Sequence, residues 1–245
     1  MKKFLILVCI LFVSVAIAES LTVTWYNIDG TTYTNTTCEP GGTITLPVAP
    51  NIPGYTFLGW KPYYTRIKYL EATGGEVIST GTTAYQNTKV RIKFNVANSG
   101  LVFGFFNGPS QEYRFFVSPS LLMFDYGSQA TRLTANTTSG QIRDILFGNL
   151  YIKDYATNTL LAGTEQSSPV AWHNDSDLSI FSLSWPASVG DRIYLLQIWQ
   201  GDTLVRDMIP VVHEGTVCMY DKVSDTFFYN ISNSGRFIAG PIITD

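Results

Sequence analysis

The chain has 245 residues, of which 16 are lysine or arginine and 19 are aspartate or glutamate, so its formal net charge is −3. A mildly acidic chain without a basic cluster binds nucleic acid and anionic lipid poorly, so we expect neither as a partner. The length is sufficient for more than one domain with a buried core.

The first 18 residues have the three parts of a secretory signal peptide. Lys2 and Lys3 form a positive start, residues 4–15 an apolar run, and residues 16–18 a small-residue cleavage pattern, Ala-Ile-Ala. The apolar run is shorter than the roughly 20 residues of a membrane span, so we expect no stable membrane insertion. Cleavage after Ala18 removes two lysines, changes the net charge from −3 to −5, and predicts a secreted or cell-envelope protein.

After the leader, short runs of β-branched and aromatic residues alternate with clusters of Gly, Asn, Asp, Pro and Ser. This pattern is typical of antiparallel β-sheet, so we predict a nearly all-β chain. The strongest predicted strands are residues 21–28, 89–96, 101–106, 113–118, 192–199, 203–212, 216–223 and 226–231. Gly201-Asp202 and Ser224-Asp225 separate neighbouring runs at hairpin distance, which predicts two antiparallel hairpins near the C-terminus.

Residues 19–64 carry three linked motifs, VTWYNIDG, EPGGTITLP and PGYTFLGW. These motifs resemble the internalin B-repeat, also called the Listeria/Bacteroides repeat, a small β-rich domain of bacterial surface proteins. Tyr55, Phe57 and Trp60 supply the large apolar area that so small a domain needs. Members of the family continue into a further strand, whereas this chain changes character at Tyr63-Tyr64. The repeat is therefore truncated, or its last strand comes from the following domain.

The second part of the chain, residues 65–245, has softer motifs. They are IKYLEATGGEVISTG near its start, LVRDMIP, and GTVCMYDKVSDTFFYN followed by GRFIAGP near its end. In these motifs the segment resembles a concanavalin-like, or laminin-G-like, jelly-roll domain of secreted bacterial proteins. The resemblance implies two antiparallel sheets packed face to face about 10 Å apart. It implies no activity by itself, because one fold hosts many functions.

Arg206 and Asp207 stand side by side in the apolar run at residues 203–212. Because successive residues of a strand point to opposite faces, these two side chains cannot form one reactive site. Each needs a partner on a neighbouring strand, and Asp221 and Lys222 have the same alternation. We therefore predict a cross-strand pair of Arg206 with Asp221 or of Asp207 with Lys222, and a structural role for both.

The usual sequence signatures of catalysis are missing. A jelly-roll glycosidase typically places two carboxylates at i and i+4 on one strand face, and this spacing occurs here only across a predicted turn. His173 and His213 are the only histidines, which excludes a histidine-rich metal site, and His213 reads as part of an exposed turn. We expect a non-enzymatic protein with no cofactor, unless the fold brings distant carboxylates together.

The most site-like segment is WHNDSD, residues 172–177, which we interpret as a loop. Its asparagine and aspartates are oxygen donors at a spacing that suits calcium, but the Gly and distal Glu of a dedicated calcium loop are missing. Asn and Asp also favour ordinary turns. Trp172 and Trp185 have the kind of side chain that stacks on sugar rings. The predicted ligand-binding residues are Trp172, Asp175, Asp177 and Trp185.

Together these features predict an exported, non-enzymatic module that binds a glycan or a surface protein. Two alternatives stay open. The first is a structural or assembly component that pairs with another chain through a sheet edge or the truncated repeat, and the second is a divergent polysaccharide-degrading enzyme. The sequence does not determine the oligomeric state, or whether Cys38 and Cys218 form a disulfide.

Overall fold

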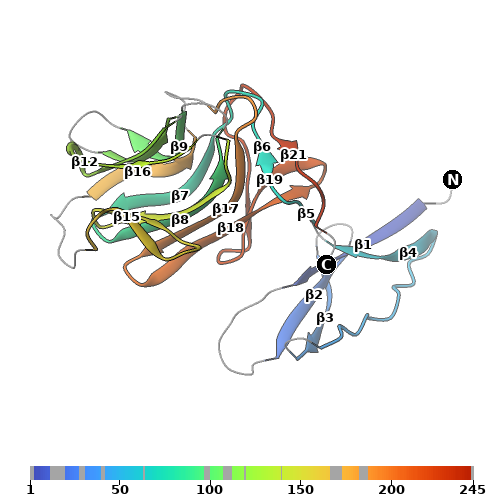
Figure 1. Cartoon of the computed structure of the whole chain (residues 1–245). Helices are drawn as coiled ribbons and strands as arrows, with labels where there is room; N and C mark the ends of the chain where they lie inside the picture. Colours follow the sequence, from blue (N-terminus) through green and yellow to red (C-terminus); the bar gives the residue numbers. More distant parts are fainter. Residues whose placement is uncertain are drawn as a thin grey trace. The chain divides into compact units, whose positions relative to one another are not determined.

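The computed structural model describes residues 3–11, 20–27, 31–39, 42–62, 64–96, 100–106, 112–118, 120–138, 140–165, 173–181 and 187–243. Strands account for 61% of the chain, and no helix occurs within these ranges. The predicted all-β fold class is therefore confirmed. The chain separates into two units, Met1–Thr65 and Arg66–Asp245, which are described in turn (Figure 1).

The first unit contains a four-stranded sheet in the order β3-β2-β1-β4. Its strands are β1 (Lys3–Leu11), β2 (Leu21–Tyr26), β3 (Thr32–Cys38) and β4 (Tyr55–Pro62). β1 pairs antiparallel with β2 and parallel with β4. A central strand of this sheet therefore consists of residues that the sequence assigns to a leader.

The second unit contains a six-stranded antiparallel sheet, which we call the small sheet, in the order β12-β11-β10-β9-β16-β7. Inward-facing apolar residues alternate with outward-facing ones along its strands, as the period of two in the sequence predicts. The strands are β7 (Ile78–Tyr85), β9 (Gly100–Phe106), β10 (Glu112–Val117), β11 (Leu121–Tyr126), β12 (Ser128–Asn136) and β16 (His173–Ile180).

The large sheet has eleven strands, and its main path runs β15-β14-β13-β8-β17-β18-β19-β20. The path contains β8 (Thr88–Asn95), β13 (Arg143–Gly148), β14 (Tyr151–Asp154), β15 (Thr159–Gly163), β17 (Arg192–Gln200), β18 (Thr203–His213), β19 (Thr216–Asp221) and β20 (Thr226–Phe228). Beside it pair β5 (Thr65–Arg66), β6 (Leu70–Glu71) and β21 (Ile238–Ala239).

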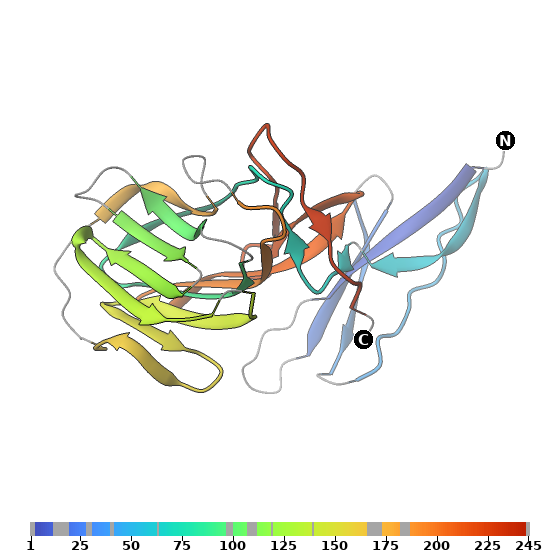
Figure 2. The same ribbon diagram turned by 45° about the horizontal axis from the view of Figure 1, so that its top comes forward.

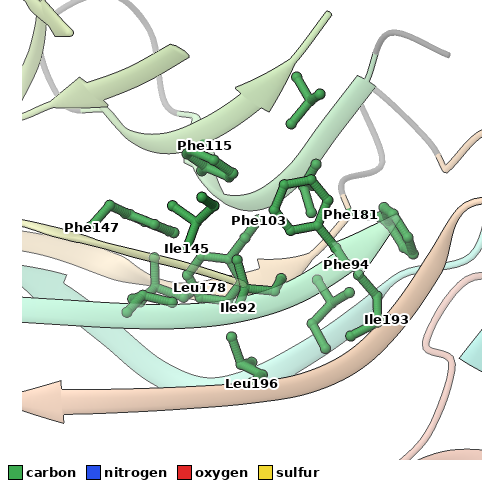
Figure 3. Close-up of a cluster of buried hydrophobic side chains, with 14 of the residues drawn as sticks. Ile92, Phe94, Phe103, Phe115, Ile145, Phe147, Leu178, Phe181, Ile193 and Leu196 are labelled. Atoms are coloured by element: carbon green, nitrogen blue, oxygen red, sulfur yellow. The ribbon is translucent and has the colours of Figure 1, made fainter. Parts of the chain in front are cut away.

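One apolar core lies between the two sheets (Figure 3). Phe115 from the small sheet stacks on Phe147 from the large sheet with ring centroids 4.6 Å apart. Phe94 of the large sheet meets the edge of the same Phe115 ring at 5.7 Å. Each such ring contributes about 1.5–3 kcal/mol through burial, so side chains that interdigitate between the layers hold the sandwich together.

The two predicted C-terminal hairpins are confirmed. β17 pairs antiparallel with β18 around Gly201-Asp202, and β19 pairs antiparallel with β20 around the turn that contains Ser224-Asp225. In both places a short polar turn joins two apolar runs whose hydrogen-bonded ladder sets the register.

The first and last segments of the second unit run side by side (Figure 2). β21 pairs antiparallel with β6, with Ala239 opposite Leu70. Thr73 Oγ1 contacts the carbonyl oxygen of Arg236 at 3.1 Å, and the Arg236 N–H donates back to Thr73 Oγ1 at 3.0 Å. These bonds bring both ends of the unit to one side of the sandwich.

Candidate functional site

Two of the four predicted binding residues, Asp175 and Asp177, lie on β16, where both are exposed. Trp172 and Trp185 lie outside the described residues. The interpretation of WHNDSD as a loop was wrong from His173 onward, because β16 is paired with β7 on one side and with β9 on the other. Leu178 and Ile180 face the core and alternate with Asp177 and Ser179, and this period of two outweighs the turn preference of Asn and Asp.

Asp177 has a neighbour on the edge strand β7. Ser79 Oγ donates a hydrogen bond of 2.7 Å to Asp177 Oδ2. Ser179, two residues along β16, lies directly opposite Ser79 in the ladder. The three side chains share the side of the small sheet that points away from the core, which we call the small-sheet outer face.

The same face continues across the remaining four strands. Gly104 on β9 lies between Ser179 and Arg114 of β10. Asp125 on β11 lies opposite Arg114, and Arg132 on β12 lies opposite Asp125. The register therefore places one polar row across all six strands of the sheet.

Asp125 is the centre of an ion-pair triad. Its Oδ2 is 2.6 Å from Arg114 Nε, and its Oδ1 is 2.6 Å from Arg132 Nε. A second bond of 2.9 Å joins Arg132 Nη2 to Asp125 Oδ2, so this guanidinium binds the carboxylate through two nitrogens. The side chain of Asp125 is 2% exposed and that of Arg132 is 41% exposed, so one arginine of the triad reaches solvent.

The electrostatics of the triad favour a charged carboxylate. Burial alone would raise the pKa of Asp125, but hydrogen bonds from Arg132 and Arg114 outweigh it and hold this pKa below its ordinary value. Two arginines and one aspartate leave the triad with a net positive charge. The arrangement is a rigid group of hydrogen-bonding atoms on a sheet face.

Gly104 has a steric role in this row. Its φ is +132°, and a Cβ built at this position would collide with the carbonyl oxygen of Tyr113 and with Cα of Arg114. Any larger residue would therefore push β9 away from β10 at the point where Arg114 is held. The glycine keeps the backbone beside Arg114 in place and leaves no side chain between it and Ser179.

Apolar side chains flank the polar row. Phe116 on β10 lies opposite Met123 on β11, and both are half-buried. They point to the outer face, because their neighbours Phe115 and Phe124 lie in the core. A polar row beside an apolar strip is the surface that a sugar ring needs, since its hydroxyl groups form hydrogen bonds and its C–H face packs on apolar atoms.

Asp177 and Asp125, on different strands of this face, do not have the spacing of a glycosidase pair. Asp177 and Asp125 lie on β16 and β11, three strand intervals apart, which corresponds to about 14 Å at about 4.8 Å per interval. Retaining glycosidases use carboxylates about 5.5 Å apart and inverting ones about 6.5–9.5 Å apart. Asp125 is in addition bound by two arginines.

The outer face of the large sheet carries a different set of charges. Arg91 binds both carboxylate oxygens of Asp144 at 2.8 Å and donates to Gln197 Oε1 at 3.0 Å. Gln197 Nε2 donates to Asp207 Oδ1 at 3.0 Å, and Lys222 Nζ lies 2.6 Å from Asp207 Oδ2. We call these five residues the large-sheet ladder. Each member is bound to the next, as cross-strand pairs on a sheet face commonly are.

The predicted cross-strand pairing of Arg206 and Asp207 is confirmed, since both of the alternative pairs form. Arg206 Nη1 lies 3.8 Å from Asp221 Oδ2, and Asp207 pairs with Lys222 in the large-sheet ladder. Arg206 Nε also donates to the carbonyl oxygen of Thr80 on β7 at 2.8 Å, so this side chain joins the two sheets. Asp221 is fully buried and accepts the backbone N–H of Asp207 at 2.7 Å.

Two further candidates from the sequence are structural. The prediction of an exposed turn at His213 was wrong: this residue ends β18, is 6% exposed, and stacks on Phe227 with ring centroids 3.9 Å apart. Burial lowers the pKa of its imidazole. Cys38 and Cys218 are free thiols, and burial raises the pKa of Cys218 to about 12, which makes it a poor nucleophile at neutral pH.

Sequence reasoning missed Arg114, Asp125 and Arg132. The signal was available in the apolar runs LLMFDY and YRFFVS, where a charged residue interrupts a strand as Arg206 does in β18. Prediction of the triad also required the register of β10, β11 and β12, which the alternation of apolar and polar residues does not determine.

Comparison with protein-family models and with curated protein sequences found no match. Among the residues whose placement is described, no group of three or more His, Cys, Asp or Glu side chains could hold a metal ion. Within the same ranges, no helix is long and apolar enough to cross a membrane.

Proposed function

We propose that the protein is an exported, non-enzymatic binding module that recognises a glycan through the small-sheet outer face. The observation that carries the proposal is the triad of Arg114, Asp125 and Arg132, which is fixed by short ion pairs and lies beside Phe116 and Met123. The leader-like start of the chain supports export, and the two arginines that hold the carboxylate of Asp125 favour ligand binding over hydrolysis at this residue.

The chemistry of the face determines the kind of ligand. Guanidinium and carboxylate groups held by each other lose little conformational entropy when they bind a ligand, so their hydrogen bonds to hydroxyl groups are preorganised. Arg132 is the most exposed member of the triad and is the residue that meets the ligand. Calcium is not required, because the polar atoms of this surface are already joined to one another.

The test is a glycan array probed with the chain lacking residues 1–18, in calcium and in chelator. We expect binding to a subset of glycans in both solutions. Arg132→Ala should weaken binding at least about tenfold, because it removes charge-assisted hydrogen bonds. The matched control is Arg91→Ala, which removes an aspartate-bound arginine from the large-sheet ladder and should leave binding unchanged.

Three outcomes would contradict the proposal. Silence across the array removes the glycan as ligand, and equal losses in Arg132→Ala and Arg91→Ala remove the small-sheet outer face as the site. Release of reducing sugar ends from a bound polysaccharide would show that the protein is an enzyme. Circular dichroism of both variants excludes loss of the fold as the cause of weaker binding.

A further inference from the structure

β1, one of the two central strands of the first unit, lies within the predicted leader. β1 spans Lys3–Leu11, inside the 18 residues that have the pattern of a signal peptide. It lies between β2 and β4 (Figure 1), with Cys9 opposite Trp25 on one side and Leu7 opposite Trp60 on the other. An exported chain from which the leader has been removed no longer contains this strand.

Removal of β1 affects the two neighbouring strands unequally. β2 retains its antiparallel partner β3 over Leu21–Tyr26. β4 is the last strand of the sheet, and within the described residues its strand partner is β1. Most of β4 would therefore present backbone N–H and C=O groups without a ladder, and a hairpin of two strands is marginally stable alone.

Aromatic side chains hold β2 and β4 at a separation that leaves room for a strand. The rings of Trp25 and Trp60 meet edge to face with centroids 4.6 Å apart, and Phe57 and Tyr33 lie 5.2 and 5.7 Å from Trp60. Trp60 Nε1 also donates to the carbonyl oxygen of Pro47 at 3.3 Å. These contacts bridge the two strand intervals, about 9.6 Å, that separate β2 from β4.

Direct pairing of β2 with β4 would move one strand about 4.8 Å toward the other. The Trp25–Trp60 contact is made with β2 and β4 two strand intervals apart, and Trp25 is 1% exposed in this arrangement. Closing the gap would force the two indole rings out of this contact, so we expect the site to favour insertion of a strand over closure.

We propose that, once the leader has been removed, an aliphatic β-strand of a partner chain occupies the position of β1. The strand would run antiparallel to β2 and parallel to β4, and its chemistry is that of β1: nine residues, mainly aliphatic, without a charge beyond the first position. The backbone ladders would supply affinity, and the aromatic rings on one side of the slot would select apolar side chains. This proposal goes beyond glycan binding and rests only on the export that the proposed function includes.

The test uses the full chain without residues 1–18 and a peptide of residues 3–11 with Cys9→Ser, flanked by lysines for solubility. Hydrogen exchange should show the β4 amides unprotected in the protein alone and protected after addition of the peptide. Peptide with Leu7→Pro, which removes a backbone donor at the centre of the strand, should bind at least about tenfold more weakly. Protein that retains residues 1–18 should bind the unaltered peptide at least about tenfold more weakly too, because its own β1 fills the slot.

Several results would overturn the proposal. One is protection of the β4 amides in the leader-free chain without peptide, because it would show that β2 and β4 have closed up. Equal binding of the proline peptide would show that the ladder is not used. Mass spectrometry that finds Met1 in the exported protein would remove its premise. The glycan array with Arg132→Ala remains a separate test, so failure of one proposal is distinguishable from failure of the other.

Discussion

On each outer face of the sandwich an aspartate joins side chains from neighbouring strands, but the two aspartates differ in their exposure. Asp125 of the small sheet is 2% exposed and bridges two arginines. Asp207 of the large sheet is 15% exposed and bridges a glutamine and Lys222, whose side chain is 41% exposed. Strand alternation puts both aspartates outside the core, and their surroundings differ.

The difference in burial decides what each aspartate contributes. An exposed ion pair is screened by water and contributes little to stability, whereas a buried charge whose partner is removed is strongly destabilising. The large-sheet ladder therefore tolerates change at its exposed end, where the side chain of Lys222 is 41% exposed. The triad on the small sheet holds nearly buried charges in position, so the loss of one partner leaves another charge unpaired.

The largest expected effect is that of Asp125→Ala. It leaves the buried charge of Arg114 without its carboxylate, and we expect the free energy of unfolding to fall by about 3–5 kcal/mol. Urea unfolding followed by tryptophan fluorescence measures this value. A loss below about 1 kcal/mol would show that water reaches the triad and would remove the contrast between the two faces.

Lowering the pH should reduce the contribution of Asp125 to the free energy of unfolding, by less than the mutation to alanine does. The pKa of Asp125 is lower in the folded chain than its ordinary value of about 3.9, so the contribution of its charge is fully present above that value and is lost as the pH falls through the folded pKa. Wild type and Asp125→Asn should differ by a constant amount between pH 7 and about pH 5, and the difference should shrink on further acidification. Chemical unfolding at each pH measures it. A difference that does not change down to about pH 2 would contradict the shift.

The smallest effect belongs to Lys222→Ala on the large-sheet ladder. Because the ammonium group is exposed, we expect a loss of about 0.2–1 kcal/mol that disappears at high salt. Urea unfolding in low and high salt measures it. A loss comparable with that of Asp125→Ala would mean that the large sheet also depends on its outer charges.

The sequence was sufficient to predict contacts between strands that are neighbours in the chain. Arg206, Asp207, Asp221 and Lys222 could be paired before the structure was known, because alternation fixed their faces and a short turn joined their strands. The position of Asp177 beside Ser79 depends on residues 98 positions apart, and no local pattern predicts that pairing. For the same reason the triad was missed, although Arg114 lies in a predicted strand.

The pairing of β6 with β21 has a consequence for how the sandwich can be built into larger proteins. The chain enters and leaves the second unit through adjacent strands. The unit can therefore be inserted into a surface loop of another protein without separating the two ends of that loop. A circular permutation that joins residue 243 to residue 66 through a short linker should fold for the same reason. Close termini of this kind allow a domain to be inserted into proteins of different fold.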